Sequence, residues 1–270
     1  MGADIKSLRT RIKSVDSTLH LTKAMGLVAS SKIRRAQDAM KRGREYEDAV
    51  GDVIETLTLC PECAKSPYMR HAEAEDNSRL CLVVIAGDRG LAGGYNANIF
   101  RLLRDYPDAT VIPIGKRACD RYAGKLYEAE RFDYAEASLL AKRICREFAE
   151  GIYDRVGIVG THYLSMMSQE AYMRPILPLT RPENREERSV IFEPDELTVL
   201  NEAVPEYVAG MLVSAVRESF ASEVAARRCA MDSAGKNAQQ MIDELQLDYN
   251  RARQGAITQE ITEIVAGSGV

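Results

Sequence analysis

Residues 5–57 read IKSLRTRIKSVDSTLHLTKAMGLVASSKIRRAQDAMKRGREYEDAVGDVIETL, and apolar or small residues recur along this stretch at alternating steps of three and four. A period of 3.5 residues kept for more than seven heptads predicts a left-handed coiled coil, because a straight helix would let the stripe drift away from its partner. Helices of globular proteins usually end within about 20 residues. A helix over residues 5–57 is much longer, and at about 1.5 Å per residue it would extend roughly 80 Å. Glu47 is the one charged residue among the spaced positions, which are 5, 8, 12, 15, 19, 22, 26, 29, 33, 36, 40, 43, 47, 50, 54 and 57.

The C-terminal end of the chain is again helix-forming, so we expect the two ends to pair as a long antiparallel coiled coil. Together with the strand and helix pattern of the middle segment, this predicts an α/β fold class. It combines a coiled coil with a Rossmann-like domain that has a mainly parallel sheet. We expect four segments: an N-terminal coiled-coil helix (1–59), a loop (60–78), the α/β domain (79–193) and a C-terminal region that is mainly the long helix (194–270).

The middle segment alternates apolar strands with helices. Residues 80–86 form an unbroken apolar run, which is typical of a strand buried on both faces. Strands that alternate with helices indicate a parallel sheet covered on both sides. Further strands are expected at 111–114 and 156–161, with 171–179 and 189–192 as additional candidates, helices at about 96–106, 116–123 and 134–151, and an exposed turn at 181–184.

Charge is unevenly distributed along the chain. Residues 1–44 hold eleven Lys/Arg and three Asp/Glu, a net charge of +8, whereas the rest of the chain carries −12 within the formal total of −4. A basic projecting helix could meet nucleic acid or an acidic protein surface, or could simply be solvated. Composition alone leaves these three readings open.

The sequence gives little sign of export, membrane insertion or metal binding. No apolar run approaches the ~18 residues needed to cross a bilayer, and the N-terminus, which begins at Met1, lacks an apolar signal core. Six irregularly spaced cysteines favour a reducing cytoplasm. Cys60 and Cys63 form a C-x-x-C pair near His71, but no second close pair of ligands exists, so we expect ordinary cysteines and no metal site.

A glycine-rich turn, GDRGLAGGYN at 87–96, follows the first expected strand. Phosphate is often bound at such a place by free N–H groups and the helix dipole. However, the dinucleotide spacing and the Lys-Ser/Thr pair of a phosphate-binding loop are both absent. We therefore favour a structural turn, formed by Asp88, Arg89, Gly90, Gly93 and Gly94, and keep a Rossmann-like nucleotide-binding enzyme and a coiled-coil nucleic-acid-binding protein as the alternative functions.

Three motifs in the expected order resemble the gamma subunit of F-type ATP synthases. They are LTKAMGLVASSKIRRAQ at 21–37, the turn at 88–94, and a C-terminal set comprising ESFASE at 218–223 and YNRARQGAITQEITEIV at 249–265. The resemblance spans both ends and the middle of the chain. Val224 and Arg228 depart from the family pattern, where His and Met are expected, which leaves the local packing open.

The resemblance implies a rotor and not a catalyst. In this family the terminal helices form a shaft inside a ring of alpha and beta subunits, and the α/β domain rests on the membrane c-ring beside the epsilon subunit. Proton flow turns the domain, and the asymmetric shaft drives the catalytic sites on beta through ATP synthesis from ADP and phosphate. The resemblance therefore implies no catalytic residue, no cofactor and no nucleic-acid partner, and membrane association only through the complex. Because the chain begins at Met1 without a leader, we expect a peripheral position on the cytoplasmic face of a bacterial plasma membrane.

The resemblance also implies roles for individual residues. Lys23 and Met25 match positions that couple the shaft to the ring, and a C-terminal group matches positions that hydrogen-bond to a catch loop on beta. The basic face of the first helix is expected to meet acidic lever segments of beta through replaceable ion pairs worth about 0–1 kcal/mol each. The C-terminal group is Arg253, Gln254 and Thr258, and the basic face is Lys32, Arg34 and Arg35.

Overall fold

The computed structural model describes residues 2–70, 79–182 and 190–267. The chain divides into two compact units: one comprises residues 31–226, and the other comprises 1–30 together with 227–270. Two long helices, α1 (Gly2–Leu59) and α5 (Glu196–Gly267), contribute to both units. The expectation of long helices at both ends of the chain is confirmed.

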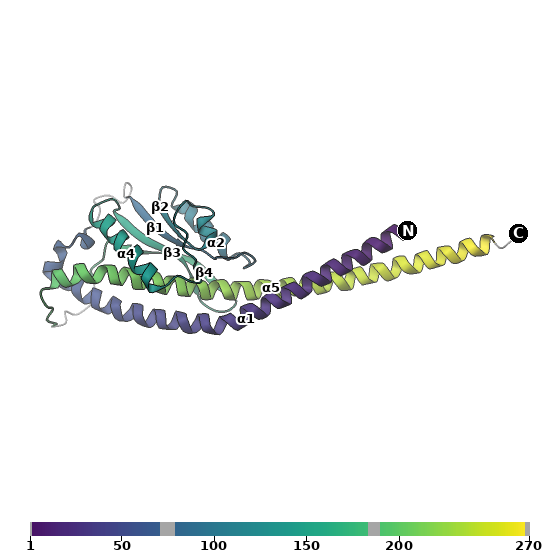
Figure 1. Ribbon diagram of the computed structural model, residues 1–270, viewed down its shortest axis with the longest axis horizontal. Coiled ribbons are helices and arrows are strands. Elements are labelled where there is room, and N and C mark those ends of the chain that lie inside the picture. The colour runs from purple at the N-terminus through teal and green to yellow at the C-terminus, as the bar shows by residue number, and fades with distance from the viewer. Residues whose placement is uncertain (1, 71–78, 183–189, 268–270) are drawn as a thin grey trace. The chain divides into compact units, whose positions relative to one another are not determined.

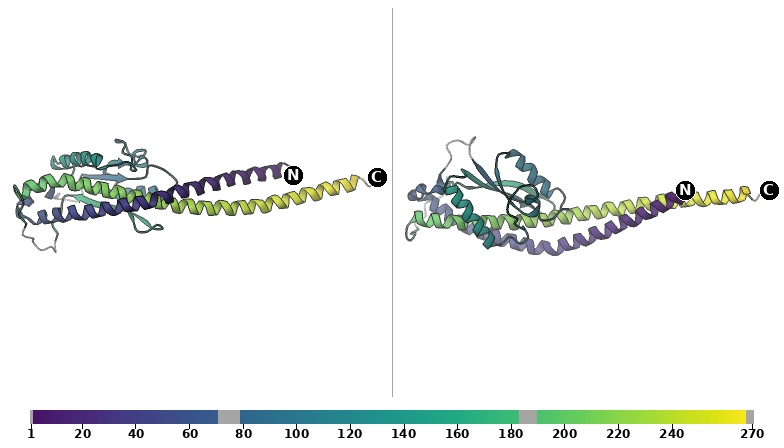
Figure 2. Two further views of the ribbon diagram at one scale, coloured as in Figure 1. Left: turned by 60° about the horizontal axis from the view of Figure 1, so that its bottom comes forward. Right: turned by 45° about the horizontal axis from the view of Figure 1, so that its top comes forward.

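In the unit formed by residues 1–30 and 227–270, α1 and α5 run side by side in opposite directions (Figures 1 and 2). Leu19 packs in an apolar cluster with Ala238 and Ile242. Further along α1, Gly26 lies next to Met231. Because the partner number falls as the α1 number rises, this pairing is antiparallel, as predicted.

The predicted coiled-coil seam matches the burial of α1. Every spaced position from Ile5 to Leu57 is buried or half-buried, and most residues between them are exposed. Small residues allow close approach in the unit 31–226, where a Cβ added at Gly43 would lie 3.3 Å from the Cα of Ser214. Tyr46 packs similarly on Gly210, whose added Cβ would lie 2.5 Å from the tyrosine ring.

The unit 31–226 contains a four-stranded sheet with the order β2-β1-β3-β4. The strands β1 (Leu80–Ile85), β2 (Thr110–Ile114) and β3 (Arg155–Tyr163) are parallel, and β4 (Gln169–Leu177) pairs antiparallel with β3. The mainly parallel sheet is therefore confirmed. The expected strand at 189–192 is wrong for residues 190–192, where Ile191 is 89% exposed and thus has no apolar burial to favour pairing, and Ser189 lies outside the described residues.

Helices cover both faces of the sheet (Figure 1). Side chains alternate along β1, so Leu82 and Val84 pack with α2 (Tyr95–Leu102), whereas Val83 and Ile85 pack with α4 (Tyr134–Ala149) and α5. This two-sided burial explains the unbroken apolar run in the sequence.

Several expected boundaries change in the structure. The helix expected at 116–123 is shorter, because α3 (Lys116–Cys119) ends before a turn in which Gly124 packs against Pro113. The expected loop after α1 contains two 3-10 helices, η1 (Pro61–Lys65) and η2 (Pro67–Met69), and a third, η4 (Leu103–Asp105), extends α2. Residues 71–78, including His71, and residues 183–184 of the expected exposed turn lie outside the described residues.

Candidate functional sites on the paired helices

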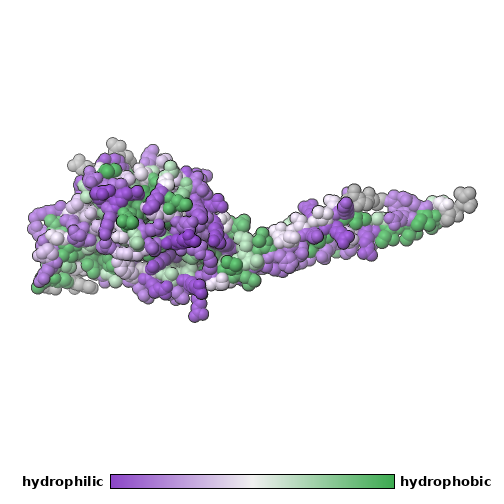
Figure 3. Space-filling view, viewed as in Figure 1, coloured by the Kyte–Doolittle hydropathy of each residue, from purple (hydrophilic) through white to green (hydrophobic). Residues whose placement is uncertain are grey.

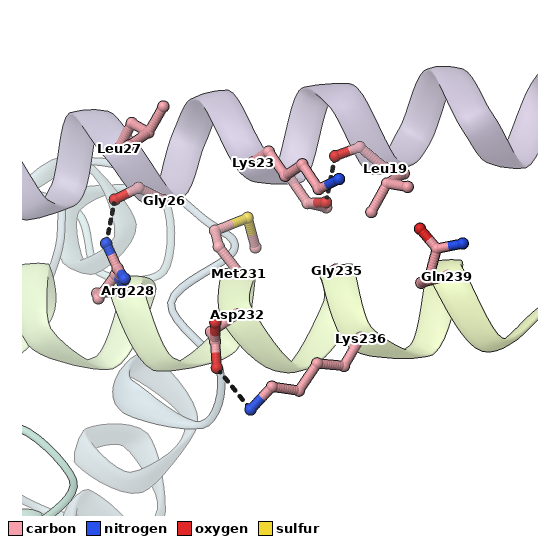
Figure 4. A pocket seen from close by; sticks show the side chains of 11 residues that line it. Leu19, Lys23, Gly26, Leu27, Arg228, Met231, Asp232, Gly235, Lys236 and Gln239 are labelled. Atoms are coloured by element: carbon pink, nitrogen blue, oxygen red, sulfur yellow. Dashed lines mark hydrogen bonds and ion pairs between the residues drawn. The ribbon is translucent and has the colours of Figure 1, made fainter.

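A groove of about 510 Å³ runs between α1 and α5 at the level of Lys23 (Figure 4). Its space exists because Gly26 and Gly235 face the opposite helix without side chains, and Met231 fills only part of the gap. Lys23 lines the groove and is exposed, whereas Met25 is half-buried and does not line it. The structure therefore places a site predicted to couple the shaft beside an accessible, partly apolar concavity.

Arg228 contributes a contact in this groove that sequence reasoning missed. Its Nη1 donates a hydrogen bond to the carbonyl oxygen of Gly26 at 3.3 Å, and Ser30 Oγ donates to the same oxygen at 2.9 Å. A glycine leaves the helix backbone open to a side chain from the opposite helix. The only sequence signal was the departure of Arg228 from the family pattern.

The predicted C-terminal coupling residues lie on a different stretch of α5 and are exposed. Thr258 Oγ1 donates to the carbonyl oxygen of Gln254 at 2.9 Å, within the same helix, and Arg253 lies beside them in sequence. The structure thus does not bring this group together with Lys23 and Met25. An apolar stripe follows, since Ile257, Ile261, Ile264 and Val265 are 43%, 56%, 70% and 65% exposed, and Figure 3 shows apolar side chains at this end of α5.

The predicted basic face of α1 is divided in the structure. Lys32 donates to the Glu130 carboxylate, and Arg89 of the glycine-rich turn lies 3.9 Å from the same carboxylate. The pKa of Glu130 is lowered chiefly by its hydrogen bond from Lys32. Arg34 and Arg35 are exposed, so they are the members of the predicted set that remain open to solvent.

The glycine-rich turn uses its polar groups internally. The carboxylate of Asp88 accepts backbone N–H bonds from Lys116 (3.1 Å), Ala129 (3.1 Å) and Glu130 (2.9 Å). The N–H of Gly87 donates to Asn96 Oδ1 at 2.9 Å. These bonds join the ends of strands and loops that are distant in sequence, which is what a structural turn does.

The backbone of the glycine-rich turn explains some of its glycines. Gly93 has a φ of 57°, in the left-handed region where glycine is favoured, and Leu91 has a φ of 61°. A Cβ added at Gly90 would lie 3.4 Å from the guanidinium of Arg117. Gly94 precedes the first residue of α2. The arrangement supports the structural interpretation of this turn.

A polar junction between α5 and β3 was also missed by sequence reasoning. Ser219 Oγ accepts the N–H of Thr161 at 3.0 Å, and Ser222 Oγ donates to the Thr161 carbonyl oxygen at 3.2 Å. The Tyr95 hydroxyl donates to the carbonyl oxygen of Ser219 at 3.0 Å, and burial raises the pKa of that hydroxyl. Polar residues in an otherwise apolar part of α5 were the available signal.

Among the described residues, neither the Cys63 thiol nor a cluster of metal-ligating side chains offers reactive or metal chemistry. Burial raises the pKa of the Cys63 thiol to about 11, which keeps it protonated at neutral pH. In the part of the chain that the structure describes, no group of three or more His, Cys, Asp or Glu side chains could hold a metal ion. Across the same described ranges, no helix is both long and apolar enough to span a bilayer.

Comparisons with known proteins cover nearly the whole chain. A family model described as ATP synthase matches residues 4–269. The chain is 38% identical to a protein named ATP synthase gamma chain from Ruminococcus albus, with 98% of each chain covered. It is 34% identical to a protein named ATP synthase gamma chain, sodium ion specific, from Acetobacterium woodii, with 99% of each covered.

Solved structures share the fold. A chain from the mitochondrial ATP synthase of Euglena gracilis, solved as the OSCP/F1/c-ring assembly in rotational state 3, superposes with a TM-score of 0.71 at 20% identity, covering 100% of this chain and 97% of that one. A chain from the central stalk and c-ring of the Tetrahymena thermophila mitochondrial enzyme gives a TM-score of 0.61 at 22% identity, covering 79% and 99%.

Proposed function

The chain belongs to the ATP synthase gamma chain family, and we propose that it is the central-stalk rotor subunit, which couples rotation of the membrane c-ring to ATP synthesis at the beta subunits. The observation that carries this function is the antiparallel pairing of α1 with α5 in a chain whose motifs match the family over nearly its full length. A shaft must resist twisting, and a seam kept over many heptads provides that stiffness.

We further propose that this chain is non-catalytic and that its partners are the alpha and beta subunits, the epsilon subunit and the c-ring. The exposed apolar stripe that includes Ile261 and Ile264 suits an uncharged sleeve around the end of the shaft. The exposed Arg34 and Arg35 suit acidic segments of beta. The complex is membrane-associated, and we place this subunit at the cytoplasmic face of the plasma membrane through its partners.

Contact with the ring is assigned to two groups of residues. Lys23 and Met25 would couple the shaft at the level of the groove, where the gap left by Gly26 and Gly235 can admit a side chain of the ring. Near the end of α5, exposed polar side chains would hydrogen-bond to beta, and Thr258, whose hydroxyl donates within the helix, would do so as an acceptor. This second group is Arg253, Gln254 and Thr258.

A nucleotide-binding enzyme is not favoured. The carboxylate of Asp88 and the amide of Asn96 already satisfy backbone N–H groups around the glycine-rich turn, where a phosphate would need them. Family membership likewise disfavours a nucleic-acid-binding coiled coil.

Reconstitution with purified alpha and beta subunits of the same organism tests the rotor function. We expect the full chain to co-purify with both subunits and to convert them into an active ATPase, while the chain alone has no ATPase activity. Binding of ATP by the isolated chain, measured by calorimetry, together with failure to associate with alpha and beta, would instead support the nucleotide-binding enzyme.

A further inference from the structure

Glu47, the one charged residue in the predicted seam, forms an ion pair with the sheet. Its carboxylate accepts a hydrogen bond from Arg174 Nη1 of β4 at 2.6 Å, and the side chains are only 18% and 32% exposed, respectively. The irregularity in the heptad pattern therefore marks a place where α1 is bound to the sheet through charge. It is not a defect in the packing against α5.

A second ion pair lies one helical turn away on α1. Arg44 Nη2 donates to Oε1 of Glu218 at 2.5 Å, and the Glu218 side chain, on α5, is only 8% exposed. The same oxygen accepts the N–H of Tyr163 at 3.0 Å and lies 3.2 Å from Nδ1 of His162. One carboxylate oxygen thus connects α1, α5 and β3.

The third contact lies two turns towards the N-terminus of α1, where Gln37 Nε2 donates to the Tyr163 hydroxyl oxygen at 2.7 Å. Steps of seven and three residues place Gln37, Arg44 and Glu47 on one side of α1. We call the three contacts the polar clamp. It consists of Gln37, Arg44 and Glu47 on α1 with Tyr163, Glu218 and Arg174 opposite them.

Apolar burial also joins α1 to the sheet domain, both near the end of the helix and alongside the clamp, where Tyr163 of β3 packs against a small apolar cluster. The main core of the domain receives α1 through Ile54 and Leu57, near the end of the helix. Alongside the clamp, α1 contributes Ala36 and Met40 to a small cluster with Ala221 of α5. Over residues 37–47 of α1, the polar clamp supplies the directional contacts that set the orientation of the helix on the sheet.

This arrangement has a mechanical consequence. Apolar contact is non-directional and resists separation more than sliding, whereas charge-assisted hydrogen bonds weaken steeply when their geometry changes. We propose that the polar clamp transmits torque from the sheet domain to α1, with Glu47, Arg174 and Glu218 as positioning residues. This inference rests on the proposed rotor function, which it extends to the path of the load.

The test replaces this chain in the complete membrane-bound complex with Glu47→Arg, with Arg174→Glu, and with both changes together. Ions pumped per ATP hydrolysed are measured in inverted vesicles, and the amount of assembled complex is measured in parallel. We expect each single reversal to lower the pumping ratio at least threefold and the double variant to recover more than half of it. If those variants do not assemble, Glu47→Gln, which keeps the side-chain size, and Arg174→Gln, which removes the positive charge, replace the reversals.

Glu62→Lys is the matched control, because Glu62 pairs with Lys65 on η1 at an exposed site outside the clamp. It should leave the ratio unchanged. The proposal is overturned if the single variants lose assembled complex but keep the wild-type ratio, or if the swapped pair shows no recovery. Failure of the rotor function itself is separate, since the wild-type chain would then neither assemble nor support pumping.

Discussion

Arg228 donates a hydrogen bond across the antiparallel helix pair to the carbonyl oxygen of Gly26, 3.3 Å from its Nη1. Replacing the arginine by leucine removes this bond but leaves the carbonyl its contact with Ser30. We expect Arg228→Leu to lower the free energy of unfolding of the full chain by about 0.5–1.5 kcal/mol. Urea unfolding followed by circular dichroism measures this change, and a variant as stable as wild type would show that the bond contributes nothing.

Two glycine substitutions should have opposite effects. A Cβ at Gly26 would lie 3.7 Å from Met231, an ordinary contact, so Gly26→Ala should stabilise α1 by about 0.5–1 kcal/mol through higher helix propensity. Gly115 has a φ of 90°, and its Cβ would lie 1.9 Å from the Ala86 carbonyl oxygen, so Gly115→Ala should cost about 3 kcal/mol or more. Thermal unfolding measures both effects, because Tm should rise for Gly26→Ala and fall for Gly115→Ala. Equal shifts in Tm would contradict this packing.

Asp88 should be essential to the glycine-rich turn because its carboxylate accepts three backbone N–H groups. An amide can replace only one of its two oxygens as an acceptor. We expect Asp88→Asn to lower the free energy of unfolding by about 1–3 kcal/mol. The exposed Asp108→Asn is the control and should change stability by less than about 0.5 kcal/mol.

The Lys32–Glu130 pair predicts a dependence of stability on pH. The pKa of Glu130 is lowered in the folded chain, first by the hydrogen bond from Lys32, so its contribution is present above the unfolded pKa of about 4.3 and is lost as pH falls through the folded value. Lys32→Met should therefore flatten the loss of stability below about pH 4.3. Because both side chains are 36% exposed, the difference should stay under about 1 kcal/mol.

Urea unfolding between about pH 3 and 7 measures this effect. The wild-type and Lys32→Met curves should lie furthest apart at neutral pH and converge in acid. Curves separated by a constant amount at every pH would show that Lys32 acts through packing alone.

The sequence predicted the helices better than it predicted the polar contacts. The seam of α1 could be read because a local period records burial, and Leu82 to Ile85 revealed a two-sided strand for the same reason. Asp88 was placed in a structural turn, but its partners lie 28 to 42 residues further along the chain, and no local pattern records such pairings.

Glu47 shows the same limit, because the sequence marked its position but not its partner. The heptad pattern identified it as an irregularity, yet its partner Arg174 is 127 residues away. In the folded chain, the partly buried Glu47 forms an ion pair with Arg174 of β4. Sequence periodicity thus locates the position of a tertiary polar contact without identifying the other residue.

Arg253 and Gln254 provide the sharpest test of the proposed contact with the ring. Both side chains are exposed on α5. Replacing both by alanine should therefore change the free energy of unfolding of the full chain, measured by thermal unfolding, by less than about 0.5 kcal/mol. In the complete complex, each would lose hydrogen bonds to beta worth about 0.5–1.5 kcal/mol. The total of about 1–3 kcal/mol should lower ATP synthesis by roughly 5- to 150-fold, since 1.4 kcal/mol corresponds to a factor of ten.

The matched control for this pair is Gln259→Ala, on the same exposed stretch, where the amide bonds Glu263 within the helix. It should retain wild-type synthesis. If Arg253→Ala with Gln254→Ala leaves both ATP synthesis and association with alpha and beta unchanged, these residues do not couple the shaft to the ring. A loss of synthesis with unaltered folding would assign the defect to the contact, because the isolated shaft does not depend on either side chain.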